Sequence, residues 1–147
     1  MTKLLVYGDS FATRVQNSLQ NMNNEIHVES YPGATSEALK DAEFGLSFLL
    51  GEDSYTAVII IAGNNDVNLT TSETISNIND MVHQCGLIPC FFLSDQKRFN
   101  HKKIGATFIQ VRTNNSHYNN DTDHLNSCGR MKWIETVAYI LDLAKNR

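Results

Sequence analysis

Residues 57–66 read AVIIIAGNND. The first six of these residues are all apolar, a pattern typical of a strand covered on both faces, as in a parallel sheet with a helical layer on either side. The polar block Gly63-Asn64-Asn65-Asp66 follows at once. Because ligands of such sheets bind beyond the carboxyl ends of the strands, the residues after each strand are the first candidates for a functional site.

Strand-like and helix-like patterns alternate along the rest of the chain. The spacing of apolar residues predicts strands over 3–7, 25–30, 57–62, 87–93 and 106–111, and helices over 11–22, 35–50, 72–85 and 125–144. This alternation with short connections predicts the doubly wound α/β class, with a five-stranded, mostly parallel sheet and helices on both faces. The length of 147 residues fits one domain over 1–147. The apolar stripe predicted for the last helix is Met131, Ile134, Val137, Ile140 and Leu141.

The composition argues against several classes of function. The formal net charge is −4 and the pI is about 5.7, whereas a nucleic-acid-binding surface is normally basic. No stretch approaches the ~20 apolar residues that span a bilayer, and the N-terminal apolar run is too short for a signal peptide. We therefore expect a cytoplasmic protein with no nucleic-acid or membrane partner. The three cysteines form no Cys-x-x-Cys pair, and four of the five histidines have no carboxylate or cysteine at metal-ligand spacing, so we expect no metal and no cofactor.

Polar residues follow four of the predicted strands. Gly8-Asp9-Ser10 follows the first strand, Gly33 the second, Asn65 the third, and a long polar loop with Asp121 and His124 the fifth. Each has an ordinary explanation when taken alone: a serine at a helix start is a common N-cap, a glycine after proline is a turn residue, and an asparagine or histidine is common in loops. Their convergence on one edge of the sheet is what favours a catalytic site.

Acyl transfer requires a nucleophile at a helix N-terminus, a base within hydrogen-bond reach, a carboxylate that orients the base, and donors aimed at the developing oxyanion. Ser10 fits the nucleophile, His124 the base, and Asp121, three residues before it, the carboxylate. The backbone amides of Ser10 and Gly33 and the side-chain amide of Asn65 fit the oxyanion donors. A glycine at position 33 would let the backbone approach a substrate closely.

In this order, the four blocks resemble the SGNH subfamily of the GDSL hydrolases. That subfamily is marked by a Gly-Asp-Ser block near the N-terminus, a lone glycine, a Gly-x-Asn-Asp block and a C-terminal Asp-x-x-His block, which here fall at 8–10, 33, 63–66 and 121–124. The resemblance extends from Leu4 to about Ala144. It implies a three-layer α/β/α sandwich and a serine hydrolase that acts on esters such as acetylated sugars, thioesters and lipids. It also implies the roles given above for Ser10, Gly33, Asn65, Asp121 and His124.

The chain is short for that family, which favours an open site and a small or accessible acyl group, for example acetyl on a carbohydrate. Asp123, directly before His124, is a second candidate to orient the histidine. A catalytically weak binding protein for a glycan or an acyl ligand is the main alternative. A flavodoxin-like receiver or nucleotide-binding domain would share the alternation but would leave Asp121 and His124 unexplained.

Three further residues, Asn64, Asp66 and His117, are expected to contact the substrate because they lie in the same loops. The basic run 97–103 follows the fourth predicted strand and therefore lies at the ligand-binding edge. It is either a solvated loop or a binding site for phosphate or a polyanionic glycan. The sequence does not decide between these two interpretations.

Overall fold

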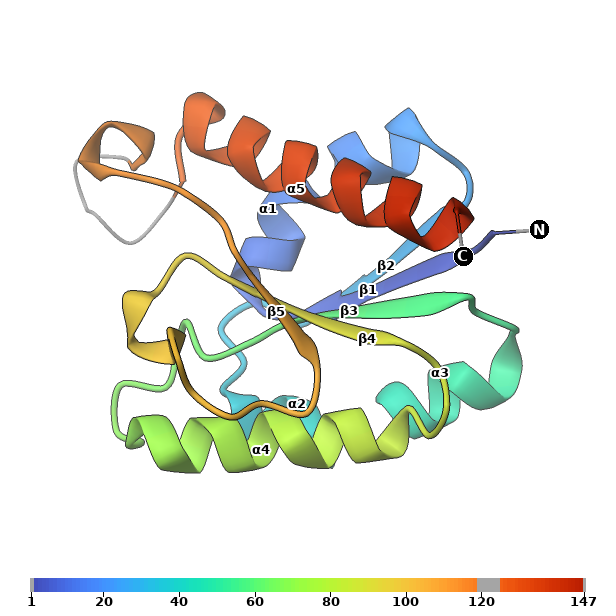
Figure 1. The fold of residues 1–147 in the computed structure, drawn as a ribbon, viewed down its shortest axis with the longest axis horizontal. Coiled ribbons are helices and arrows are strands. Elements are labelled where there is room, and N and C mark those ends of the chain that lie inside the picture. Colours follow the sequence, from blue (N-terminus) through green and yellow to red (C-terminus); the bar gives the residue numbers. More distant parts are fainter. Residues whose placement is uncertain (1, 119–124, 147) are drawn as a thin grey trace.

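A central sheet lies between two layers of helices in the computed structural model, which describes residues 2–118 and 125–146 (Figure 1). The five strands are β1 (Leu4–Gly8), β2 (Ile26–Ser30), β3 (Ala57–Ile61), β4 (Cys90–Ser94) and β5 (Thr107–Gln110). All neighbouring strands are parallel, in the order β2-β1-β3-β4-β5. The predicted α/β class and parallel five-stranded sheet are confirmed.

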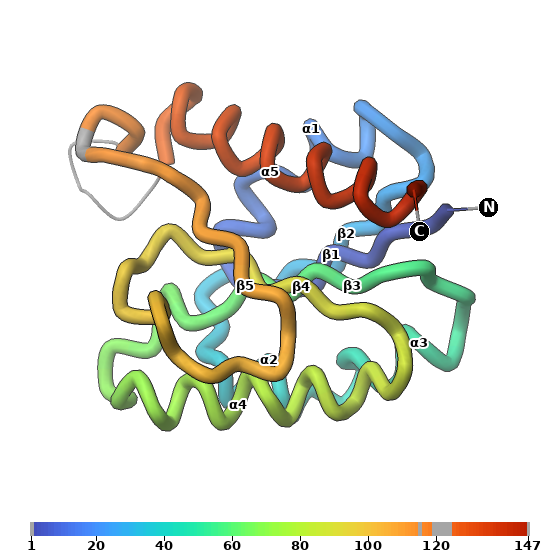
Figure 2. The backbone as a smooth tube through the Cα atoms, viewed as in Figure 1, coloured from blue at the N-terminus to red at the C-terminus, as the bar shows by residue number. Residues whose placement is uncertain are grey.

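The helices divide between the two faces of the sheet. Helices α1 (Ser10–Met22) and α5 (Ser127–Lys145) cover one face, and α2 (Ser36–Asp41), α3 (Leu46–Glu52) and α4 (Thr71–Gln84) cover the other, as the tube in Figure 2 also shows. Two short 3-10 turns, η1 (Lys97–Phe99) and η2 (Asn115–His117), follow β4 and β5. Within the described residues, no helix has the length and apolar character needed to cross a membrane.

The apolar run of β3 forms the centre of the sheet because both of its faces are buried. Ala57, Ile59 and Ile61 pack with α1 and α5, whereas Val58 and Ile60 pack with the opposite layer. All five side chains are at most 1% exposed. Side chains alternate between the two faces of a strand, so a strand with helices on both sides requires an apolar residue at every position.

The helix predicted over 35–50 is instead two helices, α2 and α3. The break falls at Ala42, whose ψ of 130° leaves the helical region, and Gly45 is the N-cap of α3. The hydroxyl of buried Tyr7 in β1 donates to the carbonyl of Leu39 at 2.7 Å, and a Cβ on Gly45 would lie 2.9 Å from that hydroxyl. This tertiary contact with the sheet accounts for the break between the two helices. The spacing of apolar residues in the sequence does not indicate it.

Two other predicted elements differ from the structure. Strand β4 begins at Cys90 rather than at residue 87, because Gly86 adopts a left-handed φ of 61° and Leu87 is fully exposed in the turn after α4. In α5 the predicted core residue Met131 is 51% exposed, and Trp133 is buried in its place. The stripe that faces the sheet is Trp133, Val137, Ile140, Leu141 and Ala144.

The start of α5 packs closely on the turn η2. The Asn126 side chain caps α5 by accepting from the Gly129 amide at 3.0 Å, and it donates to the Ser116 carbonyl at 2.7 Å. A Cβ on Gly129 would lie 2.2 Å from the carbonyl oxygen of His117. Tyr118 and Leu125 form an isolated antiparallel bridge beside this contact. The contact between η2 and the start of α5 therefore requires a glycine at position 129.

We predict that Gly129→Ala lowers the free energy of unfolding by about 1–3 kcal/mol, because the added methyl overlaps a backbone carbonyl. The matched control is Gly51→Ala in α3, where no atom lies within 4 Å of the added methyl. The control should be neutral or stabilising by up to about 1 kcal/mol, since alanine favours a helix over glycine. Urea unfolding of the three proteins measures both effects. Equal stability of Gly129→Ala and wild type would contradict the packing described.

Candidate active site

Three of the four sequence motifs, those at 8–10, 33 and 63–66, lie on loops near the point where the strand order reverses. Strand β1 leads to β2 on one side and lies beside β3 on the other, so the loops after β1 and β3 flank the switch point at which doubly wound sheets bind ligands. The amide of Asp9 donates to the Ile61 carbonyl at 3.0 Å, and the amide of Tyr31 donates to the Gly8 carbonyl at 2.8 Å. Backbone hydrogen bonds thus join β1 to both neighbouring strands at this edge.

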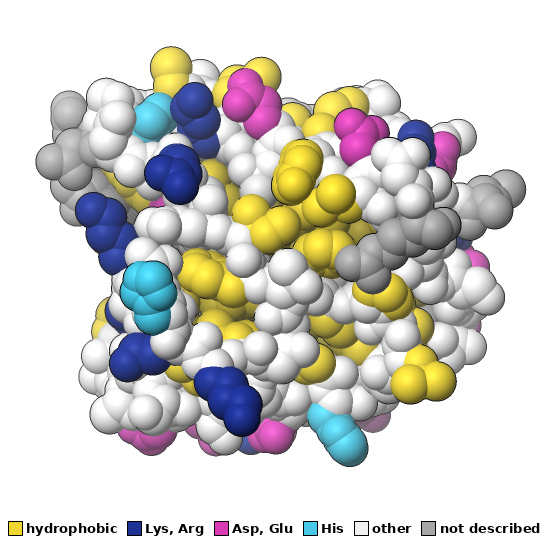
Figure 3. Space-filling model, viewed as in Figure 1, with side chains coloured by type: hydrophobic (Ala, Val, Ile, Leu, Met, Phe, Trp, Pro, Cys, Tyr) yellow, Lys and Arg dark blue, Asp and Glu magenta, His cyan; other side chains and the backbone are white. Residues whose placement is uncertain are grey.

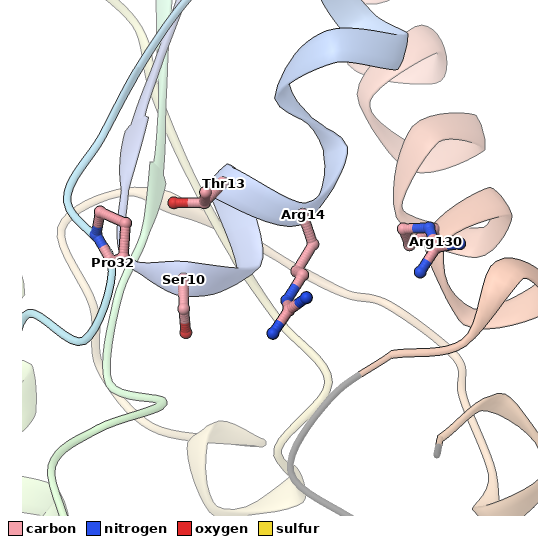
Figure 4. A pocket seen from close by; sticks show the side chains of 5 residues that line it. All are labelled: Ser10, Thr13, Arg14, Pro32 and Arg130. Atoms are coloured by element: carbon pink, nitrogen blue, oxygen red, sulfur yellow. The ribbon is translucent and has the colours of Figure 1, made fainter.

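Ser10 is the first residue of α1 and borders an open pocket of about 290 Å³. Figure 4 shows its hydroxyl pointing away from the helix, on the same side as the guanidinium of Arg14. Ser10 does not cap the helix: the Asp9 side chain does, by accepting from the Phe11 amide at 3.0 Å. No other described residue forms a hydrogen bond with the Ser10 hydroxyl, so α1 presents it to the pocket. The pocket is lined by Ser10, Thr13, Arg14, Pro32 and Arg130.

Asp9 is fully buried and links the two loops at the switch point. Besides capping α1, its carboxyl accepts from the Asn64 side-chain amide at 3.0 Å and from the Asn64 backbone amide at 3.3 Å. Burial raises the pKa of Asp9 to about 7, the hydrogen bonds from Phe11 and Asn64 oppose this rise, and the Asp66 carboxylate adds to it. Desolvation of the charged form outweighs the donors.

Asn65 and Gly33 lie together on the loops after β3 and β2. The Asn65 side-chain amide donates to the carbonyl of Ala34, next to Gly33, at 3.0 Å. Gly33 has a left-handed φ of 77°, and no atom lies within 4 Å of the position of a Cβ there. A side-chain amide has two N–H donors, and the second donor of Asn65 has no partner among the described residues. The structure therefore brings two of the predicted oxyanion residues to one place.

Asp66 is occupied by protein partners. It is 6% exposed, and its oxygens accept from the Ser36 amide at 2.8 Å, from the Ser36 hydroxyl and from the Thr74 hydroxyl at 2.7 Å. Asp66 thereby ties the first turns of α2 and α4 to the loop after β3. Asn64 is likewise engaged by Asp9. Contact of Asn64 and Asp66 with a substrate stays a prediction. The contacts observed in the structure are with other protein groups and hold the loop after β3 in place.

The basic run 97–103 contributes a residue that the sequence analysis did not assign to the site. Arg98 turns inward, donates to the Gly63 carbonyl at 2.9 Å and to the Gln96 side chain, and stacks on the buried ring of Phe99 at 4.5 Å. Gln96 donates in turn to the Asn64 side chain at 3.3 Å. The aromatic residue within a basic run was the available signal that this segment packs on the protein. Lys97, His101, Lys102 and Lys103 are exposed.

His117 is not among the residues that line the Ser10 pocket. Its Nδ1 accepts from the Asn114 amide at 2.8 Å, and its carbonyl contacts the start of α5. The candidate base His124 and the candidate carboxylates Asp121 and Asp123 lie outside the described residues. Leu125, next to His124 in the sequence, is buried, and its carbonyl accepts from pocket-lining Arg130 at 3.1 Å. Among residues 2–118 and 125–146, no group of three His, Cys, Asp or Glu side chains could hold a metal ion.

The fold matches that of solved ester-processing proteins. The catalytic domain of peptidoglycan O-acetyltransferase A from Streptococcus pneumoniae superposes with a TM-score of 0.70 at 15% identity, over 99% of this chain and 95% of that chain. A carbohydrate acetylesterase family member from Sinorhizobium meliloti gives 0.64 at 15% identity, over 96% and 99%. A lipase from a goat rumen metagenome gives 0.60 at 12% identity, over 95% and 97%. No family model and no curated protein matches the sequence. The chain has the α/β fold of the SGNH hydrolases.

We predict that Asp9 makes stability depend on pH between about 4 and 7. Because its pKa rises from 3.8 to about 7 on folding, the folded state binds the proton more tightly than the unfolded state, and stability falls as pH rises through this window. The expected loss is on the order of a few kcal/mol. Urea unfolding of wild type and Asp9→Asn at several pH values isolates this group, since the other titrating groups are common to both. Parallel pH profiles would show that Asp9 does not titrate in this way.

Proposed function

We propose that the protein is a serine esterase that removes a small or accessible acyl group through an acyl-serine intermediate. The observation that carries the proposal is the Ser10 hydroxyl, presented by the first turn of α1 to an open pocket at the switch point of the sheet. The backbone N–H groups at a helix N-terminus favour negative charge nearby. A serine in this position is suited to nucleophilic attack on an acyl carbon.

The proposed reaction has two steps. His124 takes the Ser10 proton as the serine oxygen attacks the acyl carbon, the Ser10 and Gly33 amides and the Asn65 side chain stabilise the oxyanion, and the alcohol leaves with the proton from His124. Water then attacks the acyl-serine with His124 again as base, which releases the acid and restores the serine. Asp121 is proposed to hold His124 in the required tautomer, with Asp123 as the rival.

The solved structures with this fold support an ester substrate, and they include an acetylesterase and the catalytic domain of an O-acetyltransferase. At 12–15% identity they support the reaction class and leave the acyl group open. The open pocket, with a small number of lining residues, favours a small or surface-accessible acyl group. A small-molecule or glycan ester is therefore the proposed partner. A weakly catalytic protein that binds a glycan or acyl ligand with the same pocket is the alternative.

We predict that Ser10→Ala lowers kcat for a short ester such as 4-nitrophenyl acetate by roughly 10³-fold or more, because it removes the nucleophile. The matched control is Thr13→Val, which changes a second hydroxyl residue that lines the same pocket. Initial rates of the three purified proteins provide the measurement. Equal rates for wild type and Ser10→Ala would contradict the assignment.

A fluorophosphonate label separates the enzyme from the binding protein. Stoichiometric labelling of Ser10, followed by mass spectrometry, supports the esterase, since the reagent requires an activated serine. Absence of labelling in a folded protein that still binds acetylated glycans supports the alternative.

We predict that Asn65→Ala lowers kcat by roughly 10²–10³-fold with a much smaller change in KM, as expected for an oxyanion donor that acts mainly in the transition state. Because Asn65 also donates to the Ala34 carbonyl, urea unfolding must accompany the kinetics. Loss of activity only in proportion to loss of folded protein would assign Asn65 to structure alone.

A further inference from the structure

Two arginines from different helices line the pocket that the candidate nucleophile borders. Arg14 lies four residues after Ser10 on α1, and Arg130 lies in the first turn of α5. Figure 4 shows the Arg14 guanidinium beside the Ser10 hydroxyl, and Arg130 on α5 beyond Arg14 on the same side. The other lining residues, Thr13 and Pro32, are uncharged. Within the described residues the pocket lining therefore carries two cations and no anion, in a chain with a net charge of −4.

The arginines differ in what holds them. Arg130 donates to the Leu125 carbonyl and to the Ser127 hydroxyl, each at 3.1 Å, so its guanidinium is already oriented. A guanidinium carries five N–H donors, and several of them stay available to a ligand. Arg14 is exposed, and no described acidic residue forms an ion pair with it. The pair thus combines one pre-oriented cation with an exposed one that forms no ion pair within residues 2–118 and 125–146.

We propose that this pocket selects esters carrying an anionic group, a carboxylate or a phosphate, close to the scissile bond. Planar guanidinium groups match these oxyanions through paired charge-assisted hydrogen bonds. Residues four apart on a helix have Cβ atoms about 5–6 Å from one another, so the anion lies within a few bonds of the carbonyl that Ser10 attacks. The substrate class is an acylated hydroxy compound such as a sugar acid or a sugar phosphate. This inference rests on the esterase proposed above and names its substrate class.

On Figure 3, Lys and Arg side chains gather toward the left of the molecule, where Figure 1 places the carboxyl ends of the strands. The exposed cation Lys97 of the 97–103 run follows β4 in η1 at this same edge, whereas Lys103 lies beside Asn79 and Val82 of α4. A positive field over the edge of the sheet raises the local concentration of anionic substrates. The arginines of the pocket then provide the short-range recognition.

The test uses three acetylated sugars that differ only at carbon 6: glucose, glucuronate and glucose 6-phosphate. Acetate release gives kcat/KM for each with wild type and with Arg14→Gln, Arg130→Gln and the control Lys132→Gln, an exposed cation on the same helix as Arg130. Wild type should prefer one or both anionic esters over the neutral ester. Each pocket variant should lower that preference roughly tenfold, and Lys132→Gln should not. The preference should also weaken as salt is raised.

The outcomes separate the inference from the esterase proposal. If wild type cleaves neutral and anionic esters equally, the anion pocket is refuted and the esterase proposal stands. The same holds if Arg14→Gln prefers anionic esters as strongly as wild type and the control Lys132→Gln do. If wild type cleaves no ester, the esterase proposal fails. Binding of glucuronate and glucose 6-phosphate, measured by NMR titration, then decides the pocket: binding that Arg14→Gln weakens upholds it, and absent or unchanged binding overturns it. Preference for only one anionic ester identifies the source of the anion.

Discussion

The buried carboxyl of Asp9 is the contact on which the geometry of the site depends. It caps α1 from one side and binds both amides of Asn64 from the other, so the loop after β1 and the loop after β3 share a single acceptor. Burying a carboxyl is unfavourable unless its oxygens are hydrogen-bonded, and the raised pKa of Asp9 records the part of this cost that the donors do not offset. Since Asp9 takes the capping role, Ser10 becomes the first helical residue with its hydroxyl directed to the pocket.

A second aspartate extends the same construction to the opposite helical layer. Asp66 binds the start of α2 through Ser36 and the first turn of α4 through Thr74, while Arg98 holds the Gly63 carbonyl at the other end of the block. The four residues 63–66 are therefore fixed at both ends, and Asn65 lies between the fixed points. An oxyanion donor works best when it needs no reorganisation during the reaction, so these contacts favour the oxyanion role proposed for Asn65.

The sequence predicted the centre of the sheet well because β1 and β3 are buried at every position and are therefore apolar along their whole length. It failed where tertiary contacts decide. The break between α2 and α3 depends on Tyr7, some 30 residues away in the chain, and the burial of Trp133 instead of Met131 depends on which face of α5 the sheet covers. For the site, the sequence showed which polar residues follow the carboxyl ends of the predicted strands. Whether an oxygen faces a ligand or a protein donor, as for Asp66, is a property of the packed structure.

The two arginines also link recognition to the segment that carries His124. Arg14 is on the same helix as Ser10, so one helical turn sets the distance between the proposed nucleophile and the proposed anion site. Arg130 holds Leu125, directly after His124 in the sequence, through a backbone carbonyl. If Arg130 binds a substrate anion as well as the Leu125 carbonyl, the substrate immobilises the Arg130 guanidinium further. Leu125 is then immobilised with it. Binding energy from a remote part of the substrate can then be used to order the catalytic groups, which raises kcat as well as affinity.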